Sequence, residues 1–142
     1  MAQIEKYCTV LASVLPFEQK FYTKATYVGH PLLDEIPEFK LQATQEGAIA
    51  FLPGSRKSEI QRLMPLFREV ASKIPHKEKL LVIPPHLDES DIAKMHGSIM
   101  GFSVCRNTYE AFMKSEFAFI CSGTATLEAA LVGVPFVLAY KA

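Results

Sequence analysis

From about residue 48 onward, short apolar runs alternate with stretches in which apolar residues recur at three- and four-residue steps. The short runs are typical of buried strands, and they lie at 48–52, 80–83, 102–105, 117–121 and 135–140. The periodic stretches predict helices at 58–74, 89–95, 109–114 and 124–132. Because strands and helices alternate, we expect an α/β fold: a Rossmann-like, doubly wound parallel sheet covered by helices on both faces.

The helix at 58–74 has the clearest pattern. Ser58 with Gln61 fits a capping box at its start. An apolar stripe is expected to face the sheet, and the charged side chains of the opposite face are interpreted as solvated. Those charged residues are Glu59, Arg62, Arg68, Glu69 and Lys73.

The chain before residue 47 has a different organisation. Residues 7–15 are predicted to form a buried strand, 17–24 a short helix and 26–28 a second strand. A β-α-β fragment with only two strands leaves an open sheet edge, which native domains normally cover. We therefore expect residues 1–36 to be the C-terminal remnant of a domain whose beginning is absent. A polar linker at 37–46 and a second domain at 47–142 would follow.

Composition narrows the function classes. The chain has 142 residues, with 15 basic and 15 acidic side chains and a formal net charge of zero. A neutral total gives no electrostatic footprint for nucleic acid, so any anion site must be local. No apolar run approaches the roughly 20 residues that span a bilayer, and the N-terminus lacks a signal-peptide core. We expect a cytoplasmic protein whose cysteines, Cys8, Cys105 and Cys121, are reduced thiols.

Two strand-to-helix turns carry the candidate chemistry. The first follows the strand at 48–52 and the second follows the strand at 117–121. If the strand order is 3-2-1-4-5, the first and fourth strands are neighbours that flank the topological switch point. Ligands bind at that point, so both turns are predicted to line one crevice although they lie about seventy residues apart.

The residue types of the two turns suit a sugar nucleotide. A glycine lets a phosphate approach the backbone, a helix start offers N–H groups, and Arg56 offers a bidentate guanidinium. Glu128 can accept hydrogen bonds from ribose hydroxyls but suits a phosphate poorly. The predicted UDP-binding residues are Gly54, Ser55, Arg56, Ser122, Gly123, Thr124, Thr126 and Glu128.

The residues of the two turns also have purely structural interpretations. Each turn alone is also an ordinary strand exit or helix cap, and Glu128 could merely satisfy a helix N-terminus. Neither turn is a Walker loop or a Gly-x-Gly-x-x-Gly fingerprint. No Asp-x-Asp pair suggests a metal-bound diphosphate, so neither a metal nor a cofactor is predicted. The histidines are assigned to surface, hinge or packing positions.

Four ordered stretches resemble a known family. They are Leu15-Pro16-Phe17-Glu18, Tyr27-Val28-Gly29-His30-Pro31-Leu32, Leu52-Pro53-Gly54-Ser55-Arg56 with Glu59-Ile60, and Ser122-Gly123-Thr124-Ala125-Thr126-Leu127-Glu128-Ala129-Ala130-Leu131. With them the chain resembles the bacterial lipid-A-disaccharide synthases, inverting, metal-independent glycosyltransferases of the GT-B type. These enzymes consist of two Rossmann-type domains facing a cleft, and the resemblance assigns residues 47–142 to the UDP-sugar-binding domain, incomplete at its C-terminus.

The resemblance implies transfer of a diacylglucosamine unit from UDP-2,3-diacylglucosamine to 2,3-diacylglucosamine 1-phosphate, which releases UDP. It implies work at the cytoplasmic face of the inner membrane, with possible peripheral contact. The catalytic base is expected on the absent domain, so the chain alone is expected to be inactive, and Arg56 would stabilise the leaving group. The loop Arg106-Asn107-Thr108 is a candidate uracil contact from its fold position.

Two alternatives stay open at this stage. One is a non-catalytic nucleotide-binding module that never had a partner domain. The other is a UDP-sugar epimerase of the same fold, which would keep acid and base residues in its first domain. The open sheet edge before residue 28 favours the glycosyltransferase fragment over a self-contained module.

Overall fold

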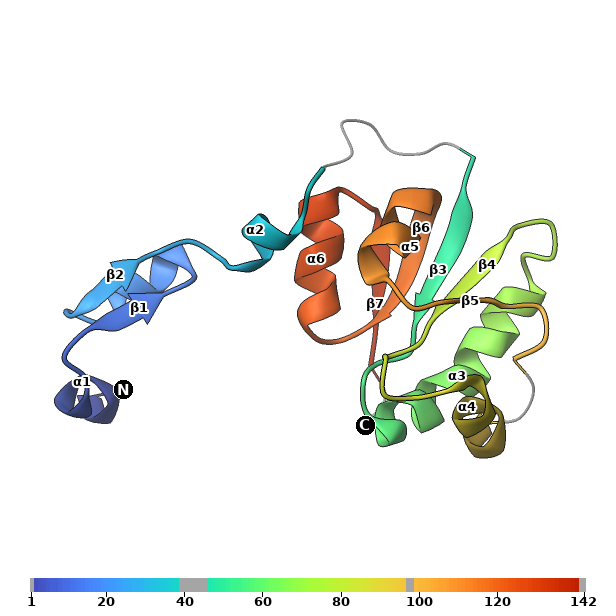
Figure 1. Cartoon of the computed structure of the whole chain (residues 1–142), viewed down its shortest axis with the longest axis horizontal. Helices are drawn as coiled ribbons and strands as arrows, with labels where there is room; N and C mark the ends of the chain where they lie inside the picture. Colours follow the sequence, from blue (N-terminus) through green and yellow to red (C-terminus); the bar gives the residue numbers. More distant parts are fainter. Residues whose placement is uncertain (1, 39–45, 97–98, 141–142) are drawn as a thin grey trace. The chain divides into compact units, whose positions relative to one another are not determined.

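A computed structural model describes residues 2–38, 46–96 and 99–140 of the chain. The chain divides into two compact units, Met1–Pro37 and Glu38–Ala142 (Figure 1).

The second unit alternates strands and helices as predicted. Its elements are β3 (Ala48–Leu52), α3 (Lys57–Ser72), β4 (Lys79–Val82), α4 (Glu89–His96), β5 (Ser103–Cys105), α5 (Thr108–Lys114), β6 (Ser115–Cys121), α6 (Thr124–Val132) and β7 (Phe136–Ala139). All five strands run parallel, in the order β5-β4-β3-β6-β7. In sequence positions this is 3-2-1-4-5, so the predicted doubly wound order is confirmed, with β3 beside β6 at the switch point.

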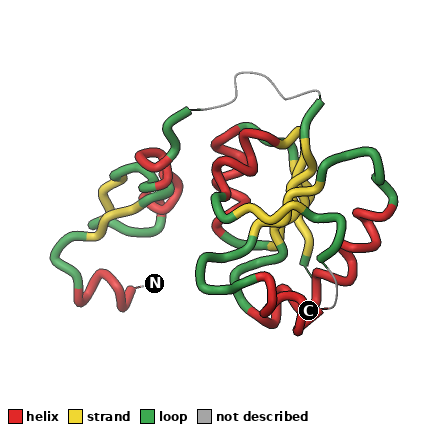
Figure 2. The backbone as a smooth tube through the Cα atoms, turned by 45° about the vertical axis from the view of Figure 1, so that its right-hand side comes forward, coloured by secondary structure: helices red, strands yellow, loops and turns green. Residues whose placement is uncertain are grey.

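Helices lie on both sides of this sheet (Figure 2). α3 contacts α4, and α5 contacts α6, so the helices pair in two groups. At the edge strand β7 the cover is thinner than predicted, because Val137 and Leu138 are 48% and 53% exposed. An edge strand has only one strand neighbour, and β7 packs against α6 on one side.

Aromatic side chains fill the space between α3 and the sheet. Phe51 stacks on Phe119 with ring centroids 5.2 Å apart, and it meets Phe67 of α3 edge-on at 5.4 Å. The residues of α3 that are buried repeat at helical spacing, as predicted: Ile60, Leu63, Met64, Phe67 and Ala71. Burial of each large apolar side chain contributes on the order of 1.5 to 3 kcal/mol, so this packing stabilises α3 against β3 and β6.

The first unit differs from the prediction in detail. Its elements are α1 (Ala2–Tyr7), β1 (Leu11–Ser13), the 3-10 helix η1 (Pro16–Lys20), β2 (Ala25–Tyr27) and α2 (Leu32–Glu35). The predicted buried strand at 7–15 is wrong in length and burial, since Tyr7 ends a helix and Val10 is 72% exposed. The helix predicted at 17–24 is one short 3-10 helix. β1 and β2 do pair in parallel, and this sheet has two strands among the described residues.

The carboxylate of Glu18 helps to close the stretch from Ser13 to Glu18, where the backbone N–H of Glu18 also donates to the carbonyl oxygen of Leu15 at 3.1 Å. Glu18 accepts a hydrogen bond from the hydroxyl of Ser13 at 2.8 Å and one from the backbone N–H of Leu15 at 3.3 Å. The turn therefore closes through local polar contacts, because the surrounding apolar side chains have little to pack against: Phe17 and Phe21 are 54% and 57% exposed.

Candidate functional site

One cavity of about 490 Å³ is lined by both predicted turns. It lies where β3 and β6, adjacent strands of the sheet, reach their carboxyl ends. The predicted site residues that line it are Gly54, Ser55, Arg56, Ser122, Gly123, Thr124 and Glu128. The expectation that two turns distant in sequence meet at one cavity is therefore confirmed.

Thr126 is the predicted residue that does not line this cavity. Its hydroxyl donates a hydrogen bond to the carbonyl oxygen of Gly123 at 2.7 Å, and its backbone N–H bonds the same oxygen at 3.2 Å. Thr126 thus stabilises the start of α6 rather than pointing its hydroxyl into the cavity. The sequence pattern could not separate these roles, because a threonine in a first helical turn can serve either.

The first turn is built tightly around Gly54. Gly54 has a φ of +115°, and a Cβ placed on it would lie 2.6 Å from Oε2 of Glu59 and 3.3 Å from Sγ of Cys121. A side chain at this position is excluded by both the backbone conformation and the contacts. The chain can therefore leave β3 and start α3 in four residues only because position 54 is glycine.

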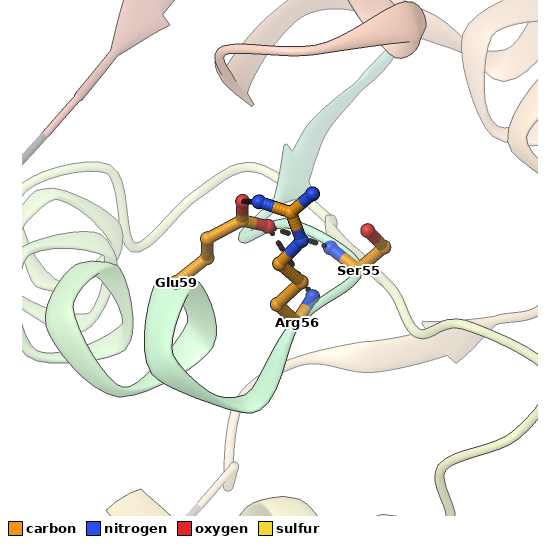
Figure 3. Close-up of polar contacts among 3 residues, drawn as sticks. All are labelled: Ser55, Arg56 and Glu59. Atoms are coloured by element: carbon orange, nitrogen blue, oxygen red, sulfur yellow. Dashed lines mark hydrogen bonds and ion pairs between the residues drawn. The ribbon is translucent and has the colours of Figure 1, made fainter.

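Glu59 belongs to the site, although the sequence pattern assigned this residue to the solvated face of its helix. Its Oε2 accepts hydrogen bonds from the backbone N–H groups of Ser55 and Arg56, both at 3.2 Å (Figure 3). The predicted capping box of Ser58 and Gln61 is wrong, because α3 begins at Lys57 with Arg56 as its N-cap. The signal was present in the spacing: a glutamate three residues after the N-cap commonly reaches back to the free N–H groups.

Arg56 extends from this turn into solvent. Its side chain is 81% exposed, and its Nη1 lies 3.7 Å from Oε1 of Glu59. A contact of this length at an exposed side chain contributes at most about 1 kcal/mol. The guanidinium is therefore held loosely at the rim of the cavity.

The second turn is more open. Gly123 is the N-cap of α6, and a Cβ placed on it would meet no atom within 4 Å. Thr124, Ser122 and Glu128 line the cavity beside it. The backbone of this turn thus leaves room for a ligand to approach closely.

A third wall comes from the loop between β5 and α5. Arg106 and Thr108 line the cavity together with Pro84 and Pro85. The guanidinium of Arg106 donates to the carbonyl oxygen of Pro84 at 3.2 Å and to that of Leu87, so it ties this loop to the end of β4.

Asn107, from the same candidate uracil loop, has a structural role. Its side chain accepts a hydrogen bond from the backbone N–H of Glu110 at 3.2 Å and caps α5. Asn107 is not among the residues that line the cavity, whereas its neighbours Arg106 and Thr108 are.

Cys121 forms part of the cavity lining at the end of β6. Cys121 is 6% exposed, and all three cysteines of the chain are free thiols. Burial raises the pKa of the Cys121 thiol above its ordinary value, and the negative charge of Glu59 raises it further. The thiol is therefore protonated at neutral pH and behaves as a small apolar group.

Ionisable side chains of both signs line the cavity: Arg56, Arg106, Glu59 and Glu128. In the part of the chain that the structure describes, no three His, Cys, Asp or Glu side chains are grouped closely enough to hold a metal ion. Across the same residues, none of the helices combines the length and apolar character needed to cross a membrane.

Comparison with known proteins places the chain in a family. The sequence model of the lipid-A-disaccharide synthetase family matches residues 1–142. A lipid-A-disaccharide synthase of Campylobacter jejuni subsp. jejuni serotype O:2 is 53% identical over 148 residues, which cover 98% of this chain and 40% of that protein. The corresponding proteins of Helicobacter acinonychis (strain Sheeba) and Helicobacter pylori (strain G27) are 49% and 48% identical over 145 residues, with the same coverage. The chain, which spans 40% of the length of these curated relatives, belongs to the lipid-A-disaccharide synthetase family.

Proposed function

We propose that the cavity between the two turns binds the diphosphate and ribose of a UDP-sugar donor. One observation carries this proposal: Arg56 and Glu128, which are about seventy residues apart in the sequence, line the same cavity at the switch point of the sheet. A volume of about 490 Å³ is ordinary for a small-molecule site.

Each turn would bind a different part of the ligand. The guanidinium of Arg56 suits the diphosphate, because it can donate two parallel hydrogen bonds to phosphate oxygens. The hydroxyls of Ser122 and Thr124 and the backbone at Gly123 add neutral donors beside it. Glu128 suits the ribose, because a carboxylate accepts hydrogen bonds from a pair of hydroxyls and repels phosphate.

In the whole enzyme, this site would serve transfer of a diacylglucosamine unit from UDP-2,3-diacylglucosamine to 2,3-diacylglucosamine 1-phosphate. An acceptor hydroxyl would displace UDP with inversion at the anomeric carbon, without a metal ion. Negative charge grows on the departing UDP, and Arg56 would stabilise it with charge-assisted hydrogen bonds to the phosphate oxygens. The base that takes the proton of the acceptor hydroxyl would belong to an acceptor domain, of which residues 1–36 would be the end.

The remaining parts of the proposal concern organisation and location. Residues 37–46, of which 39–45 lie outside the described residues, would be the linker, and residues 47–142 would be the donor-binding domain. The enzyme would work in the cytoplasm, at the cytoplasmic face of the inner membrane where its acylated substrates reside. Family membership supports this assignment.

Two experiments test the proposal. Titration calorimetry of the 142-residue chain with UDP should give saturable binding that uridine alone does not match. Transfer activity should appear when residues 1–142 replace the matching segment of the Campylobacter jejuni relative, and not in the chain alone. Binding of UDP together with an inactive chimera would favour the non-catalytic module, and epimerised UDP-sugar would favour the epimerase.

A further inference from the structure

Glu59 lies where a phosphate would be expected. Helix starts bind phosphate because their first N–H groups have no partner inside the helix. At the start of α3, the N–H groups of Ser55 and Arg56 already donate to the carboxylate of Glu59. The protein thus places an anion of its own at the first turn of the cavity.

We propose that this carboxylate competes with the diphosphate for the first turn, and that Glu59 thereby lowers the affinity of the site for UDP and favours its release. The inference rests on the proposed function of the cavity as a UDP-sugar site. Glu59 lines the cavity, but its carboxylate has no hydrogen-bond donor to offer a phosphate.

The contacts of Glu59 are suited to exchange. Its two hydrogen bonds are 3.2 Å long, whereas charge-assisted bonds in proteins are usually about 2.7 to 2.9 Å. Its contact with the guanidinium of Arg56 is 3.7 Å, beyond hydrogen-bond distance (Figure 3), and the side chain of Arg56 is 81% exposed. A diphosphate can replace all three contacts with shorter ones.

Position 54 shows that the carboxylate occupies the close-approach site. The nearest atom to a Cβ built on Gly54 is Oε2 of Glu59, at 2.6 Å. The space that a glycine leaves beside the backbone is therefore used by the carboxylate and not by open cavity. At Gly123 the equivalent space contains no atom within 4 Å.

Charge makes the competition directional. The ionisable residues that line the cavity are Arg56, Arg106, Glu59 and Glu128, so their formal charges cancel. Free UDP carries one more negative charge at its terminal phosphate than the diphosphate of a UDP-sugar does near neutral pH. Repulsion by Glu59 is therefore stronger for the product than for the donor, which assists product release.

The test is calorimetric titration of the full 142-residue chain with UDP, UDP-N-acetylglucosamine and uridine, comparing Glu59→Gln with Glu69→Gln. Glutamine keeps an oxygen that can accept from the two N–H groups and removes the charge. Glu69 is the matched control, because it lies on the same helix and pairs with Lys73 at 3.0 Å outside the cavity. The two variants lose the same charge from α3.

Glu59→Gln should bind UDP about three- to tenfold more tightly than the native chain, which corresponds to roughly 0.7 to 1.4 kcal/mol. The gain should be smaller for UDP-N-acetylglucosamine, absent for uridine and absent in Glu69→Gln. Unchanged or weaker UDP binding in Glu59→Gln, with native binding intact, would overturn the competition and leave the proposed function standing. Absence of UDP binding in every variant would overturn both.

A second measurement does not depend on the variant. In the native chain, saturation with UDP should shift the carboxyl ¹³C resonance of Glu59 together with the amide resonances of Ser55 and Arg56. The corresponding carboxyl resonance of Glu69 should not move. A stationary Glu59 resonance in the UDP-saturated chain would show that the carboxylate keeps its place, and the inference would then be wrong.

Discussion

The two turns at the switch point have the same topology and opposite construction. Each joins a parallel strand to a helix through a glycine, and both line one cavity. The first turn is filled, because the carboxylate of Glu59 packs against Gly54 and accepts from the N–H groups that follow. The second turn is open at Gly123, where no atom lies within 4 Å of a Cβ position.

This difference separates two ways of meeting an anionic ligand. An open glycine turn offers its backbone at once, whereas a filled turn must first give up an internal contact. In the filled turn the exposed guanidinium of Arg56 becomes the main source of attraction for a phosphate. The comparison therefore predicts that the first turn depends on charge and on glycine at 54, and the second on hydroxyl and carboxylate chemistry.

The largest effect is expected from Arg56→Ala in the chimera with the Campylobacter jejuni relative. Loss of the donor that stabilises the leaving group should lower kcat/KM, with a rise in the activation free energy of roughly 2 to 4 kcal/mol. Steady-state transfer assays measure this directly, and Arg62→Ala on the exposed face of α3 is the control. A loss smaller than about twofold would show that the guanidinium does not reach the phosphates.

The next effect contrasts the two glycines. Gly54→Ala should destabilise the chain by about 1 to 3 kcal/mol more than Gly123→Ala, the usual penalty for overpacking. The added Cβ at 54 would clash with Glu59 at 2.6 Å, and at 123 it would meet nothing within 4 Å. Urea unfolding followed by circular dichroism gives both free energies of unfolding. Both glycines have a positive φ, 115° at Gly54 and 158° at Gly123, so both substitutions strain the backbone. Equal values would mean that the contact with Glu59 adds no cost beyond that strain.

A smaller effect is expected at Glu128 in the second turn. Glu128→Gln should weaken UDP binding by about 0.5 to 1.5 kcal/mol. It should weaken binding of 2′-deoxyuridine diphosphate less, because that nucleotide lacks the 2′-hydroxyl that would donate to Glu128. Titration calorimetry with both nucleotides tests this difference. Thr126→Ala is the control, since its hydroxyl bonds the carbonyl oxygen of Gly123 and should leave both affinities unchanged. Equal losses for both nucleotides would place Glu128 away from the 2′-hydroxyl.

The smallest effect concerns Cys121, which lies between the turns. Its raised pKa keeps it protonated at neutral pH, and only the thiolate reacts with iodoacetamide, so Cys121 should label slowly there. Glu59→Gln removes the smaller of the two causes of the raised pKa, so the labelling rate at a fixed pH near 8 should rise. Mass spectrometry of digested samples measures each site. A rate that Glu59→Gln leaves unchanged would place the carboxylate farther from Cys121.

The second unit was predictable because its local pattern and its packing agree. β3 spans the residues predicted from its apolar run, and α6 begins and ends where its periodic stretch does. The first unit was less predictable. Residues 7–15 have the apolar composition of a buried strand, but among the described residues no layer covers them. Apolar runs predict strands only when the fold supplies that cover.

By itself, the sequence determined the alternation of strands and helices, and the placement of glycine, hydroxyl and charged residues after the first and fourth strands. Periodicity and turn chemistry are local properties, so they can be read from neighbouring residues. Only the tertiary structure decided that Glu59 folds back onto Gly54, that Thr126 caps its own helix and that Arg106 joins the cavity wall. Spacing allows the local contacts of Glu59 and Thr126 without choosing them over solvated alternatives. The position of Arg106 in the cavity wall arises only once β4 and β5 pair.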